Sequence, residues 1–338
     1  MNNGHDCPLI WGGMLAQGGR KVESERGAPR TVSAMSSGAR ILVTGVTGQV
    51  AGPVARALAK DNEVFGAARF RKGRGRDAVE AAGITPVHLD LEDADFDDLP
   101  DDIDYVCNFA VAKTNDFGRD LAANGEALGL LMRRYRDAEA FLHCSSTAVY
   151  EPKGHEPIAE DDPLGDNHRP FGFMPTYSIS KTAAEVVARS AARAYDLPTT
   201  IARLSVPYGE EGGGWPAFHL ELMLAGHPIP VHEDGPSIYN PLHEDDIVEQ
   251  VPRLLAIADV PPTVVNWAGN DAVSIEEWTA ELEHLTGVVP RLAPTRSTIE
   301  SVRVDTTRLH ELVGPAKVEW REGLRRLAEA RHPRLFMD

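Results

Sequence analysis

A short apolar run that meets two glycines and then a helical stretch places the strongest constraint on this fold. Residues 39–44 (ARILVT) are apolar and partly β-branched, which is typical of a strand buried on both faces. Gly45 and Gly48 follow, and residues 50–60 have the pattern of a helix. Glycine also caps ordinary turns, but a glycine turn between a buried strand and a helix N-terminus can approach a pyrophosphate closely. The unit therefore predicts dinucleotide binding if further alternating strands follow.

Strand-like and helix-like segments do alternate over the next 160 residues. Further strands are predicted at residues 63–68, 84–89, 104–110, 140–145 and 198–204. Helices are predicted at 120–136 and in the Ala-rich stretch that ends at residue 195. Strands that alternate with helices indicate a parallel sheet covered on both faces. The fold class is therefore α/β, a Rossmann-like doubly wound sheet with a smaller C-terminal substrate-binding or capping region.

Three segments are expected along the chain. Residues 1–38 lack periodicity and are interpreted as a flexible extension, so that a chain starting at Met35 should keep its stability. Residues 39–205 form the dinucleotide-binding core with the catalytic residues. Residues 206–338 are mainly substrate-binding, with some strands returning to the core and helices near 215–225, 243–258 and 274–286. This last segment is expected to cover the carboxyl ends of the strands, where ligands bind in such folds.

Charge and cysteine content limit the partners. The 338-residue chain has a formal net charge of −17, which argues against a nucleic-acid surface. No segment has the length or flanks of a membrane span or a signal peptide. The three cysteines show no disulfide or metal spacing, and Cys107 and Cys144 lie in apolar runs typical of buried thiols. A reducing compartment, the cytoplasm, is expected.

Tyr177-Ser178-Ile179-Ser180-Lys181 opens the Ala-rich helix and supplies the main catalytic candidates. Four-residue spacing places Tyr177 and Lys181 on one helix face. A free tyrosine has a pKa of about 10, and a nearby ammonium favours the phenolate. The phenol could then move a proton to or from a carbonyl oxygen. Alternatively, the two residues merely share an exposed face, and the rest of the chain decides between the two interpretations.

Basic residues crowd the end of the second predicted strand. An acidic residue at that point would bind the ribose hydroxyls of NAD. Here the chain reads Arg69-Phe70-Arg71-Lys72, with Arg74 and Arg76 close behind. Such a run is usually a solvated charge cluster, but beside the ribose it favours a 2′-phosphate. NADP is the predicted cofactor, with NAD the less favoured alternative.

The ordered motifs resemble those of the extended short-chain dehydrogenases/reductases, within the NAD-dependent epimerase/dehydratase-like group. The resemblance covers roughly residues 39–330. Its motifs are T-G-V-T-G-Q-V-A at 44–51, H-L-D-L at 88–91, N-F-A at 108–110, Asn124-Gly125, S-S-T-A-V-Y at 145–150, the Tyr177 motif, and P-L-H-E-D-D at 241–246.

This resemblance implies roles for individual residues. Ser146 would bond the reacting oxygen, Tyr177 would move its proton, and Lys181 would bind the nicotinamide ribose and tune Tyr177. Asp90 and Leu91 would meet the adenine. The remaining implied cofactor contacts are Gly45, Thr47, Gly48, Gln49, Val50, Ala110 and Val206. Asp90 could instead cap a helix and Ser146 could simply end a strand. The resemblance also implies a homodimer built on segment 120–136 and the Tyr177 helix.

Several positions depart from the nucleotide-sugar members of this group. Val206 stands where an asparagine is typical, and Ile238-Tyr239-Asn240-Pro241 lacks the arginine that binds a diphosphate. Thr147 and Ala148 replace the acidic pair of sugar dehydratases. Acidic residues nearby, at 210, 211, 233 and 234, are expected to repel a diphosphate. A small carbonyl compound or alcohol is therefore the predicted substrate, held by Ser146, Tyr177 and the aromatic residues Tyr208, Trp215 and Tyr239.

Three functions are weighed. The leading hypothesis is an NADP-dependent oxidoreductase that reduces an aldehyde or ketone, or oxidises the alcohol, with the Ser146, Tyr177 and Lys181 set. The alternatives are a sugar-nucleotide epimerase or isomerase that uses bound NAD(P) transiently, and a cofactor-sensing regulatory protein. A broken catalytic set would favour the sensor, but all three residues are present. The scattered histidines lack ligand spacing, so no metal is predicted.

Overall fold

The computed structural model describes residue 35, residues 37–71 and residues 75–336. Seven parallel strands form its main sheet in the order β11-β6-β5-β4-β1-β2-β3. The strands are β1 (Arg40–Thr44), β2 (Glu63–Ala68), β3 (Thr85–His88), β4 (Tyr105–Asn108), β5 (Ala140–Ser146), β6 (Thr199–Leu204) and β11 (Thr263–Trp267). The predicted α/β, Rossmann-like fold class is thus confirmed.

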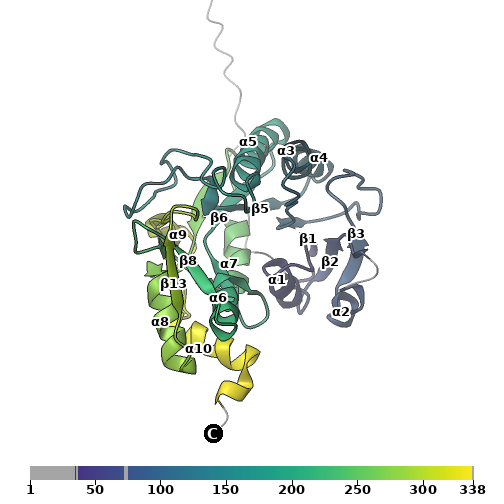
Figure 1. Cartoon of the computed structure of the whole chain (residues 1–338). Helices are drawn as coiled ribbons and strands as arrows, with labels where there is room; N and C mark the ends of the chain where they lie inside the picture. Colours follow the sequence, from purple (N-terminus) through teal and green to yellow (C-terminus); the bar gives the residue numbers. More distant parts are fainter. Residues whose placement is uncertain (1–34, 36, 72–74, 337–338) are drawn as a thin grey trace, which may run out of the picture. The chain divides into compact units, whose positions relative to one another are not determined.

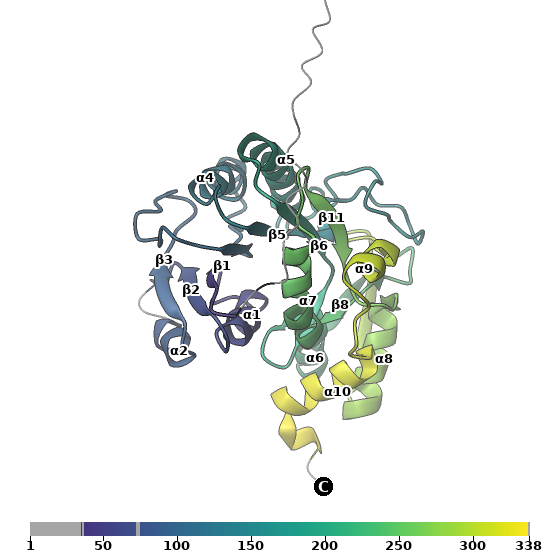
Figure 2. The same ribbon diagram turned by 180° about the vertical axis from the view of Figure 1, so that it is seen from behind.

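Helices cover both faces of this sheet, as Figures 1 and 2 show. On one side lie α3 (Phe117–Leu121), α4 (Ala127–Arg134) and α5 (Tyr177–Tyr195). On the other lie α1 (Ala51–Leu58) and α7 (Glu244–Ala256). The central strands β1, β4 and β5 are buried along nearly their whole length because apolar side chains on both of their faces meet helices.

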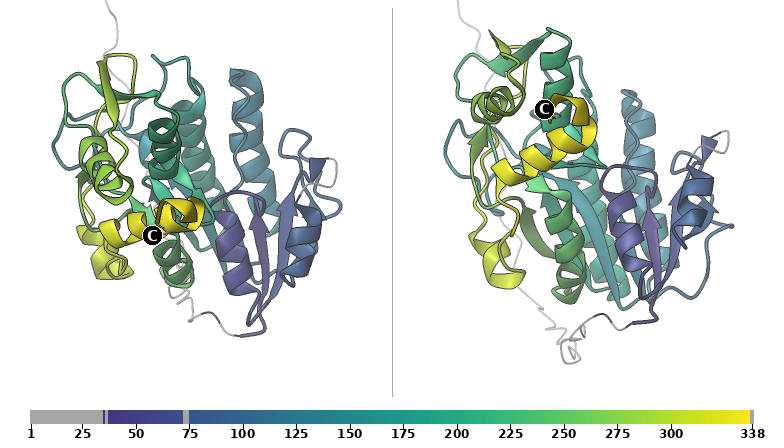
Figure 3. Two further views of the ribbon diagram at one scale, coloured as in Figure 1. Left: turned by 60° about the horizontal axis from the view of Figure 1, so that its bottom comes forward. Right: turned by 90° about the horizontal axis from the view of Figure 1, so that it is seen from below.

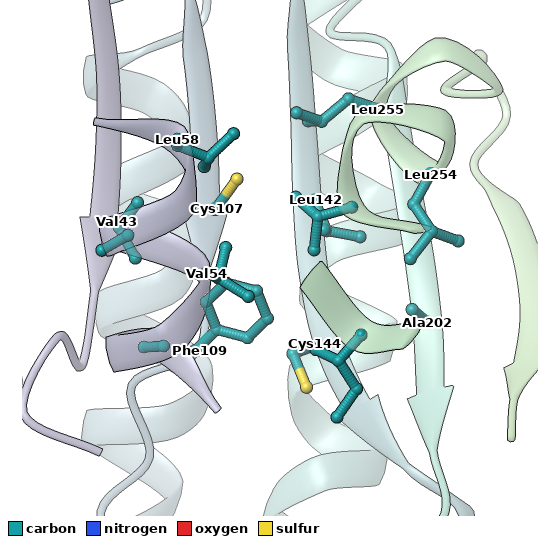
Figure 4. Close-up of a cluster of buried hydrophobic side chains, with 14 of the residues drawn as sticks. Val43, Val54, Leu58, Cys107, Phe109, Leu142, Cys144, Ala202, Leu254 and Leu255 are labelled. Carbon is teal, nitrogen blue, oxygen red and sulfur yellow. The ribbon is translucent and has the colours of Figure 1, made fainter. Parts of the chain in front are cut away.

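The cluster beneath α1 and α7 illustrates this packing (Figure 4). Val54 and Leu58 of α1 and Leu254 and Leu255 of α7 pack toward strand residues such as Leu142. Two cysteines belong to the same cluster, Cys107 and Cys144, and both are buried free thiols as predicted. On the opposite face α4 and α5 approach closely at Gly129. A Cβ at this position would lie only 2.9 Å from a methyl group of Val187.

In the main sheet and the helices that cover it, segment 120–136 and the seventh strand differ from the sequence-based prediction. Segment 120–136 is not one regular helix, because a π-helical turn (Ala122–Glu126) joins α3 to α4. Its buried Asn124 bonds the backbone of Ala112 in both directions, at 2.8 and 2.9 Å, which ties this turn to the loop after β4. The seventh strand, β11, was not predicted individually, and it extends the sheet beside β6.

The remaining elements are α2 (Arg76–Ala81) and those of the C-terminal region. The small helix α2 connects β2 and β3. The C-terminal region contains α6 (Gly214–Leu224), α8 (Ile275–Thr286), α9 (Thr307–Leu312), α10 (Trp320–Arg331), and the short strands β7 (Pro207–Gly209), β8 (Pro228–His232), β9 (Ile238–Tyr239), β10 (Leu242–His243), β12 (Val273–Ser274) and β13 (Arg291–Thr295). The yellow helix α10 packs against α6 and α8 (Figure 3).

Some predictions concern residues beyond these elements. The proposed extension over residues 1–38 lies almost entirely outside the described residues, as does Lys72. The boundary at residues 205 and 206 stays a prediction. Within the described part of the chain, none of the helices combines the length and apolar character needed to cross a bilayer.

Candidate active site

A cavity of about 430 Å³ opens at the carboxyl ends of the central strands. The glycine turn after β1 and the end of β5 both line it, together with the N-terminus of α5. Its lining residues include Gly45, Gly48, Gln49, Val50, Lys113, Cys144, Ser146, Asn167, His168, Met174, Tyr177, Lys181, Val206, Trp215, Tyr239, Ile299 and Val302. The cavity therefore brings the predicted cofactor turn and the predicted catalytic residues into one space.

The glycine turn fits a pyrophosphate on structural grounds. Gly45 has a φ of +74°, and a Cβ there would lie 3.0 Å from the backbone of Ala110. The side chain of Val50, the N-cap residue of α1, makes no capping hydrogen bond, and the first turn of that helix contains no acidic residue. Within that turn, the amide of Gly52 donates to Gly48 O at 3.0 Å and Pro53 has no amide hydrogen. An anion would therefore bind at the glycine turn itself, at the positive end of the helix.

Thr44 fixes the turn against β4. Its hydroxyl donates to Asn108 Oδ1 at 2.7 Å and accepts from the amides of Phe109 and Ala110 at 3.1 Å. These bonds hold the carboxyl ends of β1 and β4 together where the cofactor turn begins. They explain why Asn108-Phe109-Ala110 lies beside the glycine turn.

Ser146 and Tyr177 both reach the cavity. Ser146 ends β5 and its hydroxyl accepts from the amide of Ala148 at 3.2 Å. Burial raises the pKa of Tyr177, whereas the ammonium of Lys113 and a hydrogen bond with Ser146 act to lower it. In the structure as it stands, the net direction is upward, so the phenol is held protonated.

Lys181 lies one turn further along α5 and lines the same cavity. Its Nζ donates to the backbone carbonyl of Cys144 at 2.7 Å, and the residue is 4% exposed. Burial lowers the pKa of its ammonium. The predicted tuning of the Tyr177 phenol by Lys181 stays a prediction.

Sequence reasoning did not find Lys113, Asn167 and His168. Lys113 Nζ lies 5.0 Å from the centroid of the Tyr177 ring, and His168 packs edge-on against the same ring at 5.2 Å. Asn167 and His168 both come from the loop at 151–175, between β5 and α5. In the sequence, only the position of this loop just before Tyr177 indicated that its residues could reach the site.

Asn167, His168 and Ser178 form a buried polar network in the cavity wall. Ser178 Oγ donates to Asn167 Oδ1 at 2.9 Å and accepts from the backbone amide of His168 at 3.3 Å. His168 Nδ1 lies 2.6 Å from the same Asn167 oxygen, which fits an Nδ1–H donor. Asn167 Nδ2 has no protein partner within the described part of the chain. The amide is therefore an available donor in the cavity wall.

The expected adenosine end lies at the tips of β2 and β3. Arg69 is 3.9 Å from Glu92, and Arg71 is 3.5 Å from Asp90. Asp90 also accepts from the amide of Glu92 at 3.2 Å, so it stabilises a turn in addition to facing Arg71. Leu91 packs partly buried against the α4–α5 side of the core. Thr47 lines a second cavity, of about 410 Å³, between the glycine turn and α2.

Of the three aromatic residues predicted to hold substrate, two line the cavity. The rings of Trp215 and Tyr239 meet edge to face at 5.2 Å, and the Tyr239 hydroxyl donates to the backbone of Glu300 at 3.0 Å. Tyr208 does not line the cavity. It is buried against His243 and donates to the carbonyl of Trp320 at 3.3 Å, away from the cavity lining.

The predicted repulsion of a diphosphate by nearby carboxylates is also corrected. Glu210 pairs with Arg326 at 2.6 Å, Glu211 with Arg56 and Glu233 with Arg296. None of these carboxylates lines the 430 Å³ cavity. Their charge is largely compensated, so it does not argue against an anionic substrate. Among the described residues, no group of three or more histidine, cysteine or carboxylate side chains gathers at a metal-binding spacing.

A buried ion pair holds the strands and α5 around this site. Glu185, on the face of α5 that carries Tyr177 and Lys181, accepts from Arg203 of β6 at 2.8 and 2.9 Å and from Ser145 of β5 at 2.6 Å. Arg203 also donates to the Tyr150 hydroxyl at 2.9 Å. The network fixes the end of β5, and hence Ser146, relative to α5.

Comparison with known proteins agrees with this arrangement. The model of the NAD dependent epimerase/dehydratase family matches residues 41–268. The chain belongs to this family. The resemblance inferred from the motifs is therefore confirmed, and the chain is an NAD(P)-dependent extended short-chain dehydrogenase/reductase by family.

Curated relatives of this family are distant. A trifunctional UDP-glucose 4,6-dehydratase/epimerase/reductase of Arabidopsis thaliana is 25% identical over 66% of the chain, which spans only 33% of that relative. Agl12, a low-salt glycan biosynthesis protein of Haloferax volcanii, is 25% identical over 73% of the chain and 83% of its own length. A dTDP-glucose 4,6-dehydratase of Xanthomonas campestris is 32% identical over 40% of the chain and 37% of its own.

Solved structures show the same fold. The UDP-glucuronic acid 4-epimerase of Bacillus cereus, solved with UDP-glucuronic acid and NAD, has a TM-score of 0.74 at 21% identity, covering 88% of this chain and 100% of that one. A dTDP-glucose 4,6-dehydratase of Streptomyces venezuelae with NAD has a TM-score of 0.73 at 22% identity, over 87% and 97%. At these identities the two structures show the fold alone. The family match favours the epimerase alternative over the leading hypothesis of a net oxidoreductase.

Proposed function

We propose that this family member transfers a hydride at a carbinol or carbonyl carbon, with Tyr177 moving the proton of the reacting oxygen. The observation that carries the proposal is the single cavity shared by the glycine turn and by Ser146, Tyr177 and Lys181. NAD(P) would supply or accept the hydride when bound. Gly45, Gly48, Gln49 and Val50 would hold its pyrophosphate at the start of α1.

The chain's own residues then divide the remaining work. The Ser146 hydroxyl would donate to the reacting oxygen and hold it beside the phenol. Tyr177 would give its proton to a forming alkoxide, or take one from an alcohol. Lys181, braced by the Cys144 carbonyl, would reach the nicotinamide ribose. Trp215 and Tyr239 would bound the substrate with apolar surface.

The proposed substrate class is a sugar nucleotide, oxidised transiently so that the cofactor returns to its starting redox state. The family match and the printed activities of the relatives support this class. Thr147 and Ala148 lack the carboxyl groups of the sugar dehydratases, which supports epimerisation over dehydration. Glu210 and Glu211 pair with arginines, so their carboxylates are not expected to repel the diphosphate of such a substrate.

A net carbonyl reductase is the second candidate function. Val206, which lines the cavity, and the neutral segment 238–241 favour it, because neither offers a charge-assisted donor to a diphosphate. The two candidates predict different redox balances, so one experiment separates them.

That experiment combines binding with redox measurement. The protein is titrated with UDP-glucose, UDP-glucuronic acid and dTDP-glucose in the presence of NAD⁺ or NADP⁺, and products are analysed by chromatography. Micromolar binding with an epimeric product and no net NAD(P)H change supports the first candidate. Stoichiometric consumption of NAD(P)H with small aldehydes or ketones supports the second. The absence of both activities would contradict the proposal.

We also propose a preference for NADP over NAD. Arg69 stands at the end of β2, where a ribose-binding acid would favour NAD, and Arg71 follows it. Each guanidinium–phosphate contact contributes about 1.5–3 kcal/mol, which is enough for at least a roughly tenfold preference. Although both arginines face carboxylates, those pairs are long and Arg69 and Arg71 remain exposed.

Arg69→Asp is expected to weaken NADPH binding about tenfold and to improve NADH binding. Fluorescence titration of both reduced cofactors measures the two dissociation constants. Arg308→Asp, an equal charge change at an exposed position on α9, serves as the control and should leave both constants unchanged. Equal affinities for NADH and NADPH in the unmodified protein would show that the preference is absent.

The proposed assembly is a homodimer formed by α4 and α5. Ile179 and Val186 lie seven residues apart on one face of α5 and are exposed, Val186 by 61%. Leu130 of the neighbouring helix α4 is exposed as well. Exposed apolar side chains clustered in this way are typical of an interface.

Light scattering should therefore give twice the mass of one chain. Val186→Glu should shift the protein to monomer, because a carboxylate would be buried without a partner at the interface. Leu312→Glu, at an exposed leucine on α9, is the matched control and should remain dimeric. A monomeric unmodified protein would exclude this assembly.

A further inference from the structure

Asn167 carries a polar group to which the proposed mechanism gives no role. The residue lines the 430 Å³ cavity and is only 7% exposed. Its Nδ2 is buried and makes no hydrogen bond with the protein within the part of the chain that the structure describes. A buried amide without a partner is costly, so such a group generally meets a water molecule or a ligand.

The oxygen of the same amide is already occupied, and this fixes the orientation of the side chain. Asn167 Oδ1 accepts from Ser178 Oγ at 2.9 Å, and His168 Nδ1 lies 2.6 Å from the same oxygen. Burial lowers the pKa of His168 to about 4, so near pH 7 its ring is neutral and has one N–H. The short distance to Oδ1 places this hydrogen on Nδ1. The side chain therefore leaves its NH₂ group for the cavity that it lines.

Ser178 ties this amide to the helix that carries Tyr177. The serine follows Tyr177 in α5 and is fully buried. Its Oγ also accepts from the backbone amide of His168 at 3.3 Å, so the loop at 151–175 and α5 are joined at this point. His168 packs edge-on against the Tyr177 ring, with the ring centroids 5.2 Å apart. The Asn167 donor is therefore held in a set position relative to the phenol.

The chemistry of the cavity indicates what this donor can bind. Ser146 and Tyr177 are assigned to the reacting oxygen, so the Asn167 amide is available for a different oxygen of the substrate. A neutral NH₂ group suits a hydroxyl or carbonyl oxygen. Apolar side chains such as Trp215 and Val302 line the same cavity. A substrate that lacks the matching oxygen would leave the buried amide unpaired, and such sites discriminate strongly.

We propose that Asn167 is a substrate-specificity residue, whose Nδ2 donates to a second hydroxyl or carbonyl oxygen close to the reacting carbon. The second oxygen belongs close to that carbon because Asn167 and Tyr177 both contact the His168 ring. The inference rests on the proposed function in assigning the reacting oxygen to Ser146 and Tyr177, and it narrows the substrate class. In a sugar nucleotide the second oxygen is a ring hydroxyl, and in a small ketone it is an α-hydroxyl group.

Asn167→Asp removes the donor and keeps its supports. The aspartate retains Oδ1 as the acceptor for Ser178 and His168 and replaces the NH₂ group with an oxygen. Loss of the donor should weaken binding of a ligand that carries the second oxygen about tenfold. Binding of the analogue without that oxygen should change by no more than about twofold. Because a structural defect would weaken both ligands alike, the difference between them reports the hydrogen bond.

Matched ligands and a matched control variant make the test specific. The ligands are UDP-glucose with its 2-deoxy and 3-deoxy analogues, and hydroxyacetone with butanone, each titrated into the full chain with the cofactor in the redox state that prevents turnover. The NH₂ signal of Asn167 is followed by NMR of ¹⁵N-asparagine-labelled protein and assigned by its loss in Asn167→Ala. Asn115→Asp makes the same change at an exposed asparagine that does not line the cavity, and should leave every dissociation constant unchanged.

The outcomes separate this inference from the proposed function. A loss of affinity confined to the oxygen-bearing ligand, with a shift of the Asn167 signal by that ligand alone, supports the inference. Equal losses for both members of a pair, or an Asn167 signal that no ligand moves, overturn it, and the amide then meets an internal water. Turnover without a shift of the signal overturns the inference alone, whereas a shift without turnover supports it and contradicts the proposed function. If Asn167→Asp folds poorly, the signal of the unmodified protein and the Asn167→Ala variant decide the result.

Discussion

Replacing Tyr177 with phenylalanine is expected to lower kcat about a thousandfold while leaving the fold and cofactor affinity intact. The substitution removes one oxygen, and positioned proton transfer contributes about 10²–10⁴ in rate. Because the ring remains, its contact with His168 is kept. Turnover is measured with the compound that reacts in the titration experiment described above, and NAD(P)H binding is measured separately by fluorescence.

Tyr195→Phe offers a matched control for this experiment. Tyr195 lies at the last turn of the same helix, partly buried and remote from the cavity lining. Its variant should show normal turnover. Near-normal activity in Tyr177→Phe would remove the phenol from the mechanism.

Removing Glu185 should cause the largest loss of stability. Glu185 and Arg203 are each about 1% exposed, and their side chains bond at 2.8 and 2.9 Å. Glu185→Ala leaves the guanidinium buried without its carboxylate partner, which costs about 3–5 kcal/mol. Urea unfolding of the two proteins measures the difference in the free energy of unfolding.

Two further variants make this prediction specific. Glu80→Ala removes an exposed carboxylate from an i,i+4 pair with Arg76, and should change stability by no more than about 0.5 kcal/mol. The double variant Glu185→Leu/Arg203→Met removes both charges and should be less destabilised than Glu185→Ala. A loss below about 1 kcal/mol in Glu185→Ala would mean that water reaches Arg203.

The main sheet was largely predictable because parallel strands buried on both faces need continuous apolar runs. Residues 63–68 were predicted as a strand and form β2 (Glu63–Ala68). β11 carries a comparable run, Thr263–Trp267, after helix α7, in the C-terminal region where no individual strand was predicted. Only its pairing with β6 assigns it to the main sheet.

The candidate site was predictable where local spacing carries the chemistry. Gly45 and Gly48 precede a helix in sequence, and Tyr177 and Lys181 share a helix face by their four-residue spacing. Tyr208 could not be assigned in this way. An aromatic residue after a strand can line a cavity or fill a core. Tyr208 lies in the core because α10 packs against it.

The sequence alone determined the family, the doubly wound sheet, the glycine turn and the Ser146, Tyr177 and Lys181 set, because each depends on short-range pattern or ordered motifs. Tertiary structure alone decided which charges meet. Lys113 and Tyr177 are 64 positions apart, and they meet because β4 and α5 deliver them to the same edge of the sheet. Glu210, Glu211 and Glu233 looked repulsive in sequence, and only the folded chain supplies the arginines that pair with them. Charge acts through distance in space, which the order of residues does not specify.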